Sequence, residues 1–536
     1  MKEDLPAKRS GRGSHKLLVA MTPFTNVTSG VDSYPKLLSW SADYKKTGFR
    51  VTGDQVSFTM NKTIDFILND RHVRANAPSG GVVLDFLRRP QRLTGVKEAC
   101  REGACGACLV LVGERNDDTV SYRSMNSCLL PLGEIEGKHV VTIEGLNEWN
   151  NDRLTPIQQA IVDEGATQCG YCTPGIILAL TGLFLDKPDF DEEDAISAIS
   201  GNICRCTGYQ SIKRAIRQLC SIPPPLDTEE GKTRKEWLVE KGILPPYFLR
   251  IPEWLQKLPT SELPMKRSPR GIIVGGGTAL WAQKDTEWRY AELIYLSRRK
   301  ELKGIRIDQG RCHIGAATTL EEIQDSPIMQ EIFPGIREYF QLIASKPIRH
   351  RITVGGNIAD AAPFADMAVF FLATGASIVL RHGKIRRELA LKDFFKGYRK
   401  TDRRDDELLE EIRFPVHGAD VLFNFENISK RAHLDIASVN CAIQITMNNG
   451  IMERIHLSAG GVAPIPLYLA RASGHLTGRE PNAESVREAA AIAQSESSPI
   501  SDVRGSAEYK RLLLMQLIHT HFITLFPERL TLTALQ

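Results

Sequence analysis

The stretch Ala99–Val110, "ACREGACGACLV", places Cys100, Cys105 and Cys108 within nine positions of one another. Small residues fill most of the positions between them. A disulfide, a zinc site and an iron–sulfur cluster all bring cysteines this close together in a chain. The composition and the other cysteines have to distinguish these three kinds of site.

Composition limits the class of protein. The chain has 536 residues, 42% of them hydrophobic and 25% charged, which predicts about three to five globular domains. A net charge of +4 is too small to favour a nucleic-acid or anionic-membrane partner. No apolar run reaches the roughly 18 residues of a membrane span, and the N-terminal apolar stretch is short for a signal peptide. We expect a cytoplasmic protein without nucleic-acid or membrane partners, whose thiols stay reduced.

The cysteines are unevenly distributed. Eight of the eleven lie between Cys100 and Cys206, which in a reducing compartment indicates metal or redox chemistry. Cys220, Cys312 and Cys441 stand alone, as small buried residues often do.

The first cysteine set consists of Cys100, Cys105, Cys108 and Cys128, spaced C-x4-C-x2-C-x19-C. This is the spacing of plant-type [2Fe–2S] proteins. The glycines and alanines of the loop leave room for backbone N–H groups to approach the sulfurs of an anionic cluster, and glycine also adopts positive φ without strain. Structural zinc remains the alternative at this point.

The second cysteine set consists of Cys169, Cys172, Cys204 and Cys206, in "QCGYCTPG" and "GNICRCTGY". Helices predicted to start at Thr173-Pro174 and near Thr207 would direct their N-termini at these thiolates. The close Cys-x-Cys pair favours a sulfur-bridged cluster over zinc. A structural zinc site remains the alternative for this set. A thioredoxin-like use of the Cys-x-x-Cys pair lacks the βαβ context it requires.

Periodicity divides the chain. "MNKTIDFILNDRHVRA" predicts a β-hairpin from Met60 onward, and short strands continue to about residue 145. Four helical segments follow, one of them capped at Thr155-Pro156, and then a Pro-rich charged linker. We expect residues 1–59 to be an extension and Met60 to be a possible start. The predicted domain ranges are 1–59, 60–147, 148–222, 223–264 (linker), 265–418 and 419–536.

Two glycine-rich loops lie in the second half. "GIIVGGGTALW" (271–281) is an apolar strand entering three glycines and Thr278, which would cradle a phosphate, although it is neither a Walker loop nor G-x-G-x-x-G. "RITVGGNIADAAPFAD" (351–366) repeats the pattern, with Asp366 as an acceptor for a ribityl or ribose hydroxyl. Each loop alone is also a common structural turn.

"GVKEACREGACGACLV", "QCGYCTPGIILA" and "GNICRCTGYQSI" resemble the paired [2Fe–2S] domains of the molybdenum hydroxylase family, which includes xanthine dehydrogenases and aldehyde oxidases. The resemblance covers about residues 60–530, and the domain order is similar to the small subunit of bacterial xanthine dehydrogenase. Ala99, Ala104 and Ala279 depart from the residues usual in the family, but none is an iron ligand.

The resemblance implies an α+β multidomain fold: a β-grasp ferredoxin-like domain, a four-helix iron–sulfur domain, and an α/β FAD-binding domain with a small α+β C-terminal domain. It implies that both cysteine sets hold [2Fe–2S] clusters. The implied FAD-binding residues are Ile273, Val274, Gly275, Gly276, Gly277, Thr278, Ala279, Leu280, Thr353, Val354, Gly355, Gly356, Asn357, Asp366, Leu409, Lys430 and Asp435. A surface ion pair is the alternative for Lys430 and Asp435.

The resemblance also implies an activity. Electrons from a molybdenum centre would pass through both clusters to FAD and on to NAD⁺, as in the xanthine dehydrogenase that oxidises hypoxanthine and xanthine to urate. A larger molybdopterin-binding subunit would complete a heterotetramer of two small and two large chains, so no catalytic acid–base residue is expected here. The alternatives are an aldehyde or another N-heterocycle as substrate, or a non-catalytic iron–sulfur or zinc interaction module.

Overall fold

The structure is a computed structural model. It describes residues 62–147, 153–222, 233–259, 271–282, 287–416, 418, 420–431 and 433–535. The predicted extension and its proposed start at Met60 lie outside these residues. Within the described part of the chain, no helix is long and apolar enough to cross a membrane.

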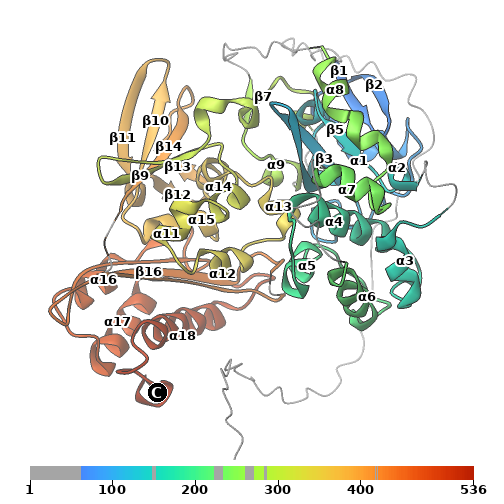
Figure 1. The fold of residues 1–536 in the computed structure, drawn as a ribbon. Coiled ribbons are helices and arrows are strands. Elements are labelled where there is room, and N and C mark those ends of the chain that lie inside the picture. Colours follow the sequence, from blue (N-terminus) through green and yellow to red (C-terminus); the bar gives the residue numbers. More distant parts are fainter. Residues whose placement is uncertain are drawn as a thin grey trace, which may run out of the picture. The chain divides into compact units, whose positions relative to one another are not determined.

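The first domain is a five-stranded mixed sheet in the order β2-β1-β5-β3-β4, which confirms the β-grasp expectation (Figure 1). The predicted hairpin is β1–β2, and Asn69 at its turn has a φ of 53°. β1 pairs in parallel with β5, and α1 covers the buried face of the sheet with Val83, Leu84 and Leu87. The elements are β1 (Lys62–Leu68), β2 (Arg71–Ala77), α1 (Val83–Arg88), β3 (Leu109–Asn116), β4 (Thr119–Asn126), η1 (Ser127–Leu129), η2 (Leu132–Ile135), β5 (His139–Val141) and α2 (Glu144–Asn147).

Four helices follow, as expected: α3 (Pro156–Asp163), α4 (Thr173–Asp186), α5 (Glu192–Ala198) and α6 (Gln210–Cys220). Thr155 caps α3 in a capping box. The helix start predicted at Thr173-Pro174 is confirmed, because α4 begins at Thr173 with Cys172 as its N-cap. The helix start predicted near Thr207 is wrong. α6 begins at Gln210 and not near Thr207, because the intervening Gly208 and Tyr209 adopt positive φ.

Part of the predicted linker is packed structure. α7 (Arg234–Glu240), η3 (Pro246–Arg250) and α8 (Ile251–Gln256) lie within it. Phe248 packs on the rings of Tyr122 and His139 of the first domain. The burial of Phe248, Trp237 and Leu238 in the same hydrophobic core is what fixes this segment, so it is not an extended connection.

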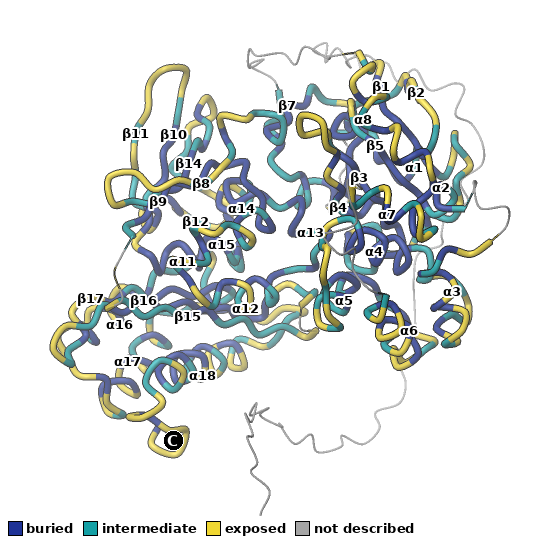
Figure 2. The backbone as a smooth tube through the Cα atoms, in the orientation of Figure 1, coloured by how far each residue is buried: buried dark blue, intermediate teal, exposed yellow. Residues whose placement is uncertain are grey.

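The second half begins with a small parallel sheet of β6 (Ile272–Val274) and β7 (Leu293–Tyr295), next to α9 (Thr278–Ala282) and η4 (Glu287–Tyr290). A five-stranded sheet follows in the order β11-β10-β14-β9-β8. The hairpin formed by β10 and β11 is exposed at its tip (Figure 2). The remaining elements of this part are η5 (Leu296–Arg298), η6 (Lys300–Leu302), β8 (Ile305–Asp308), β9 (Arg311–Gly315), α10 (Leu320–Gln324), α11 (Pro327–Ile332), α12 (Ile336–Gln341), α13 (Lys346–Arg349), α14 (Val354–Asp360), α15 (Asp366–Leu372), β10 (Ser377–His382), β11 (Ile385–Ala390), η7 (Leu391–Asp393), β12 (Phe395–Gly397), β13 (Lys400–Thr401) and β14 (Leu408–Pro415).

The C-terminal domain is a four-stranded antiparallel sheet in the order β15-β16-β17-β18, packed against helices. Its elements are β15 (Val421–Ile428), β16 (Val439–Asn448), β17 (Ile451–Gly460), β18 (Leu467–Tyr468), α16 (Ala470–Leu476), α17 (Ala483–Glu496), α18 (Ala507–Leu525) and α19 (Leu532–Leu535). This is the small α+β domain that the resemblance implied.

The first domain contacts the second half of the chain directly. Nδ1 of His350 lies 3.0 Å from the Ser124 carbonyl oxygen, and Arg123 donates to Glu322 at 2.9 Å. The indole N–H of Trp281 donates to the Gly80 carbonyl at 3.1 Å. These contacts pack the end of α13 and the helix that follows the first glycine-rich loop against the first domain.

Candidate cofactor sites

The first cysteine set converges in a loop with unusual backbone geometry. Arg101, Gly103 and Gly106 all have positive φ, which turns the chain around its cysteines. The thiols of Cys105 and Cys128 lie close enough to that of Cys100 to affect its ionisation. The Glu102 N–H points at the Cys100 sulfur from 3.5 Å. Backbone donors therefore face the sulfurs, as an anionic cluster requires.

These contacts favour the thiolate form of Cys100 and Cys108, whereas the same contacts and burial raise the pKa of Cys105 and Cys128. Hydrogen bonds from the Cys105 and Cys128 thiols lower the pKa of Cys100 well below its ordinary value. The Cys128 thiol likewise lowers the pKa of Cys108, against the effect of burial. Thiolates and not thiols are the ligands of iron.

The loop is fixed from outside by an ion-pair network. Arg101 donates to Asp85 of α1 and to Glu98, each at 2.5 Å. These side chains are partly exposed, so the network contributes more to the loop's geometry than to its stability.

The second cysteine set forms two pairs. The sulfurs of Cys169 and Cys206 lie 3.5 Å apart, and the Cys172 thiol is hydrogen-bonded to that of Cys204. The Thr207 hydroxyl lies 3.1 Å from the Cys204 sulfur. Thr207 is therefore a sulfur contact and not the start of a helix. Cys169 and Cys206 are exposed, whereas Cys204 is buried.

The arrangement of the second set suits a two-iron cluster. A [2Fe–2S] cluster takes two thiolates on each iron, and the second set already lies as two such pairs. Among the described residues, no three His, Cys, Asp or Glu side chains group around one point as ligands of a single metal ion.

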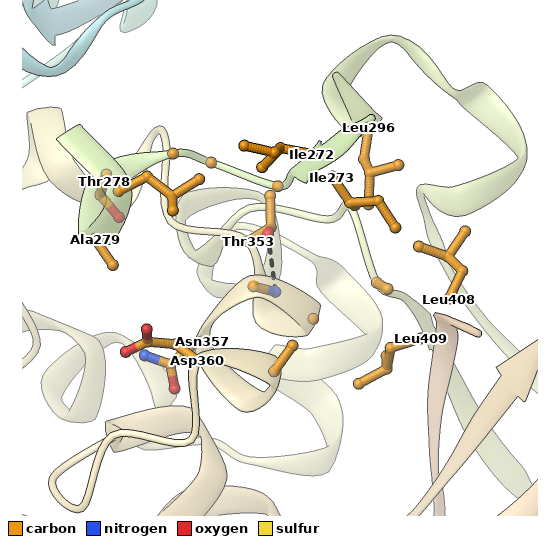
Figure 3. A pocket seen from close by; sticks show the side chains of 18 of the residues that line it. Ile272, Ile273, Thr278, Ala279, Leu296, Thr353, Asn357, Asp360, Leu408 and Leu409 are labelled. Carbon is orange, nitrogen blue, oxygen red and sulfur yellow. Dashed lines mark hydrogen bonds between the residues drawn. The ribbon is translucent and has the colours of Figure 1, made fainter. Parts of the chain in front are cut away.

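The glycine-rich loops enclose a cavity of about 550 Å³ (Figure 3). Ile273, Leu296, Leu408 and Leu409 form an apolar end, while Thr278, Asn357 and Asp360 lie toward the other end. Apolar walls with a few polar groups at one end are typical of sites for aromatic cofactors. The predicted residues that line the cavity are Ile273, Gly275, Gly276, Gly277, Thr278, Ala279, Leu280, Thr353, Gly355, Gly356, Asn357 and Leu409.

Close packing explains why these loops need glycine. The Gly356 N–H donates to the Thr353 hydroxyl at 3.1 Å, and a side chain at Gly275 would meet that hydroxyl. A side chain at Gly276 would overlap the carbonyl of Arg351. The two loops thus touch each other through backbone and leave the cavity between them open.

Family models match along the chain in the order of these sites. They are "2Fe-2S iron-sulfur cluster binding domain" (66–132), "[2Fe-2S] binding domain" (142–217), "FAD binding domain in molybdopterin dehydrogenase" (260–417) and "CO dehydrogenase flavoprotein C-terminal domain" (425–525). The chain belongs to the molybdenum hydroxylase family.

Relatives within this family have different substrates in their names. The chain is 28% identical over 489 residues to xanthine dehydrogenase of Emericella nidulans, covering 80% of this chain and 36% of that protein. It is 27% identical over 527 residues to aldehyde oxidase 2 of Mus musculus, covering 87% and 39%. A solved carbon monoxide dehydrogenase from Hydrogenophaga pseudoflava is 30% identical over 46% of this chain and 86% of its own, with a TM-score of 0.44. The chain thus spans well under half the length of these curated relatives.

Five predicted FAD residues of this molybdenum hydroxylase chain do not line the cavity. Val274 and Val354 are fully buried, because they face the hydrophobic cores behind the loops. Asp366 accepts hydrogen bonds from Asn427 at 2.9 Å and from Asn440 at 2.5 Å. Burial raises the pKa of Asp366 to about 6.

Lys430 and Asp435 also lie outside the wall of the cavity. The Lys430 ammonium donates to the Val503 carbonyl at 2.5 Å. Asp435 pairs at 2.6 Å with Arg431, four residues earlier in the same connection between β15 and β16. Asp435 thus forms the ion pair that was expected as the alternative to FAD binding. The FAD contacts of the residues that do line the cavity remain a prediction.

Sequence reasoning missed part of the cavity wall. The further lining residues are Gly271, Ile272, Leu296, Ala316, Ile352, Ala359, Asp360, Arg403, Asp405, Glu407 and Leu408. Arg403, in the polar run before β14, donates to the Glu407 carbonyl at 2.9 Å. The signal that would have found this segment is its position directly before Leu409, a residue that was predicted.

Proposed function

We propose that this chain carries electrons from a molybdenum-containing partner through two [2Fe–2S] clusters to FAD, within a xanthine dehydrogenase that reduces NAD⁺. When bound, the clusters supply one-electron transfer and FAD supplies the exchange between one and two electrons. The chain's own residues would hold these groups close together.

The arrangement of the three sites carries the proposal. Gly103, between two cysteines of the first set, lies against the side chain of Ile348 in α13. Gly201, just before the second set's Cys204, lies against Ser345 and Pro347 at the start of the same helix. α13 continues into Thr353 and the second glycine-rich loop of the cavity. One short segment therefore adjoins all three candidate sites.

The cavity supports FAD as the third group. Its loops offer backbone N–H groups and the Thr278 hydroxyl for phosphate, while its apolar end suits an aromatic ring. Asn357 is partly committed, because its side-chain oxygen accepts from the Met367 N–H at 3.1 Å. Gly275–Thr278 and Gly355–Gly356 are the residues we propose for the phosphates.

The substrate is proposed from the relatives. Xanthine dehydrogenases from a fungus and from vertebrates align over 80–89% of the chain. Aldehyde oxidases align with equal identity, so an aldehyde is the second candidate. The substrate pocket would lie on the molybdopterin-binding partner, in a heterotetramer of two small and two large chains in the cytoplasm.

The exposed part of the second set supports such a partner. Cys169 and Cys206 reach the surface, and Tyr171 and Tyr209 beside them are 45% and 36% exposed. A cluster at the surface is open to an electron donor, and exposed tyrosines are frequent in interfaces. We propose that this face receives the molybdenum subunit.

The test uses the complex purified from its native source. Xanthine-dependent NAD⁺ reduction, with about four irons and one FAD per chain, would support the proposal in full. Activity with aldehydes but not xanthine would move the substrate to the second candidate. Zinc without flavin would overturn the electron-transfer function and leave an interaction module.

A further inference from the structure

A second, smaller cavity lies behind the first glycine-rich loop. It has a volume of about 40 Å³ and shares Gly275, Gly276 and Thr353 with the wall of the large cavity. Its other walls come from the ferredoxin domain, including Glu134, and from the flavin half, including Arg351. The backbone of the glycine-rich loop is thus the partition between the two cavities.

Arg351 is a buried cation in this partition. Only 6% of the residue is exposed, and its guanidinium donates to the Gly276 carbonyl. No carboxylate among the described residues forms a direct ion pair with it, and its Nε has no described partner. A buried charge without a direct ion pair lowers the stability of the folded protein by several kcal/mol unless a nearby opposite charge or water compensates it.

Glu134 supplies the opposite charge across the small cavity. This carboxylate of η2 is 3% exposed and accepts from the Ser297 hydroxyl at 2.7 and 2.9 Å. Burial lowers the pKa of Arg351, and the charge of Glu134 opposes that effect. A volume of about 40 Å³ has room for water between the two groups.

The hydrogen bond to Gly276 has a geometric consequence for the large cavity. In a trans peptide the C=O of one residue and the N–H of the next point in opposite directions, and the described chain has no cis peptide. Because Arg351 holds the Gly276 carbonyl on the side of the small cavity, the Gly277 N–H points away from it. No described residue accepts a hydrogen bond from that N–H.

We propose that Arg351 is a positioning residue that aims the Gly277 N–H at the FAD phosphates, and that Glu134 of the ferredoxin domain holds Arg351 in place. FAD affinity then depends on a carboxylate in another domain, outside the FAD cavity. This inference rests on the proposed function only in that the large cavity binds FAD.

The experiment measures FAD binding to the deflavinated complex by flavin fluorescence, with iron content as the test of folding. Glu134→Gln keeps the side chain's shape and removes its charge, and we expect it to weaken FAD binding about fivefold. Arg351→Met should weaken it about tenfold or more. The double variant should bind no more weakly than Arg351→Met, since both changes remove the same interaction.

Two controls separate positioning from general stability. Glu136→Gln removes the ion pair of Glu136 with Arg298, in the same turn but outside the small cavity, and should leave FAD affinity unchanged. Arg351→Lys should recover most of the affinity that Arg351→Met loses. The proposal would be overturned if Glu134→Gln bound FAD as tightly as wild type, or if Glu136→Gln lost as much FAD affinity as Glu134→Gln. It would also be overturned if Arg351→Lys bound FAD no more tightly than Arg351→Met. If the wild-type complex binds no FAD, the proposed function itself fails.

Discussion

The backbone N–H of Ile203 donates a hydrogen bond to the Cys105 carbonyl at 3.0 Å. Ile203 directly precedes Cys204 of the second set, and Cys105 belongs to the first. The two cysteine sets are therefore joined by a direct backbone hydrogen bond between their loops. Asn202 adds a second, from its side-chain amide to the Gly106 carbonyl at 3.1 Å. Short bonded contacts of this kind keep two electron carriers at a fixed separation.

Asn202→Ala should loosen this junction. The change removes one of the two hydrogen bonds that the buried Gly106 carbonyl accepts, the other coming from the Leu109 N–H at 3.2 Å, and should cost about 0.5–1.5 kcal/mol in the free energy of unfolding. Thermal denaturation followed by the visible absorbance of the clusters would measure it. Asn116→Ala, which removes an exposed hydrogen bond to Ser121, is the control and should change stability by less than about 0.5 kcal/mol. Equal effects of the two variants would contradict the assigned role of Asn202.

Gly106→Ala should destabilise the protein more than the positive φ of Gly106 alone predicts. Gly106 has a φ of 69° and Gly137 a φ of 72°, so alanine is strained by about 1 kcal/mol at both. An added methyl group at Gly106 also meets the Gly201 backbone and Asn202, whereas at Gly137 it meets nothing within 4 Å.

We therefore expect Gly106→Ala to lower iron content and melting temperature, and Gly137→Ala to lower only the melting temperature, slightly. Iron analysis and thermal melts of the two purified variants measure the difference. The contact between the two loops would be in doubt if both variants kept full iron.

Gly276→Ala should remove FAD while leaving both clusters. The methyl group would overlap the Arg351 carbonyl, which forces the two glycine-rich loops apart. The flavin-to-iron ratio of the purified complex is the measurement. Gly397→Ala, in the same half of the chain with nothing within 4 Å of the added methyl group, should keep the wild-type ratio. A normal ratio in Gly276→Ala would refute the phosphate-loop assignment.

Asp366 should make stability depend on pH in an unusual direction. Burial raises its pKa to about 6, so the folded state binds the proton more tightly than the unfolded state does. Its contribution to stability is complete below about pH 4 and is lost as pH rises toward 6. A shift of about two units corresponds to roughly 3 kcal/mol.

Denaturant titrations at several pH values between 4 and 7 measure this contribution as the difference between wild type and Asp366→Asn. The difference should change steadily from pH 4 to 6 and then level off. Asp117→Asn, at an exposed turn, should run parallel to wild type. A difference that does not vary with pH would show that Asp366 ionises as freely when folded as when unfolded.

Local pattern was enough to predict most elements and both cysteine sets. The hairpin at β1–β2, the capping box at Thr155 and the spacing of the cysteines depend on residues close together in the chain, so their signals lie in the sequence. The two glycine-rich loops were also visible, and most of their predicted residues line the cavity.

The tertiary structure decided what depends on distant neighbours. Thr207 proved to be a sulfur contact because Gly208 and Tyr209 turn left-handed, and Asp366 is held by two asparagines from other strands. The sequence by itself determined which residues have the chemistry for clusters and for a phosphate loop, since that chemistry follows from residue type and spacing. That these sites lie next to one another follows only from the packing of α13 and Arg351 between domains. Such contacts depend on how separate hydrophobic cores come together, which the sequence pattern does not show.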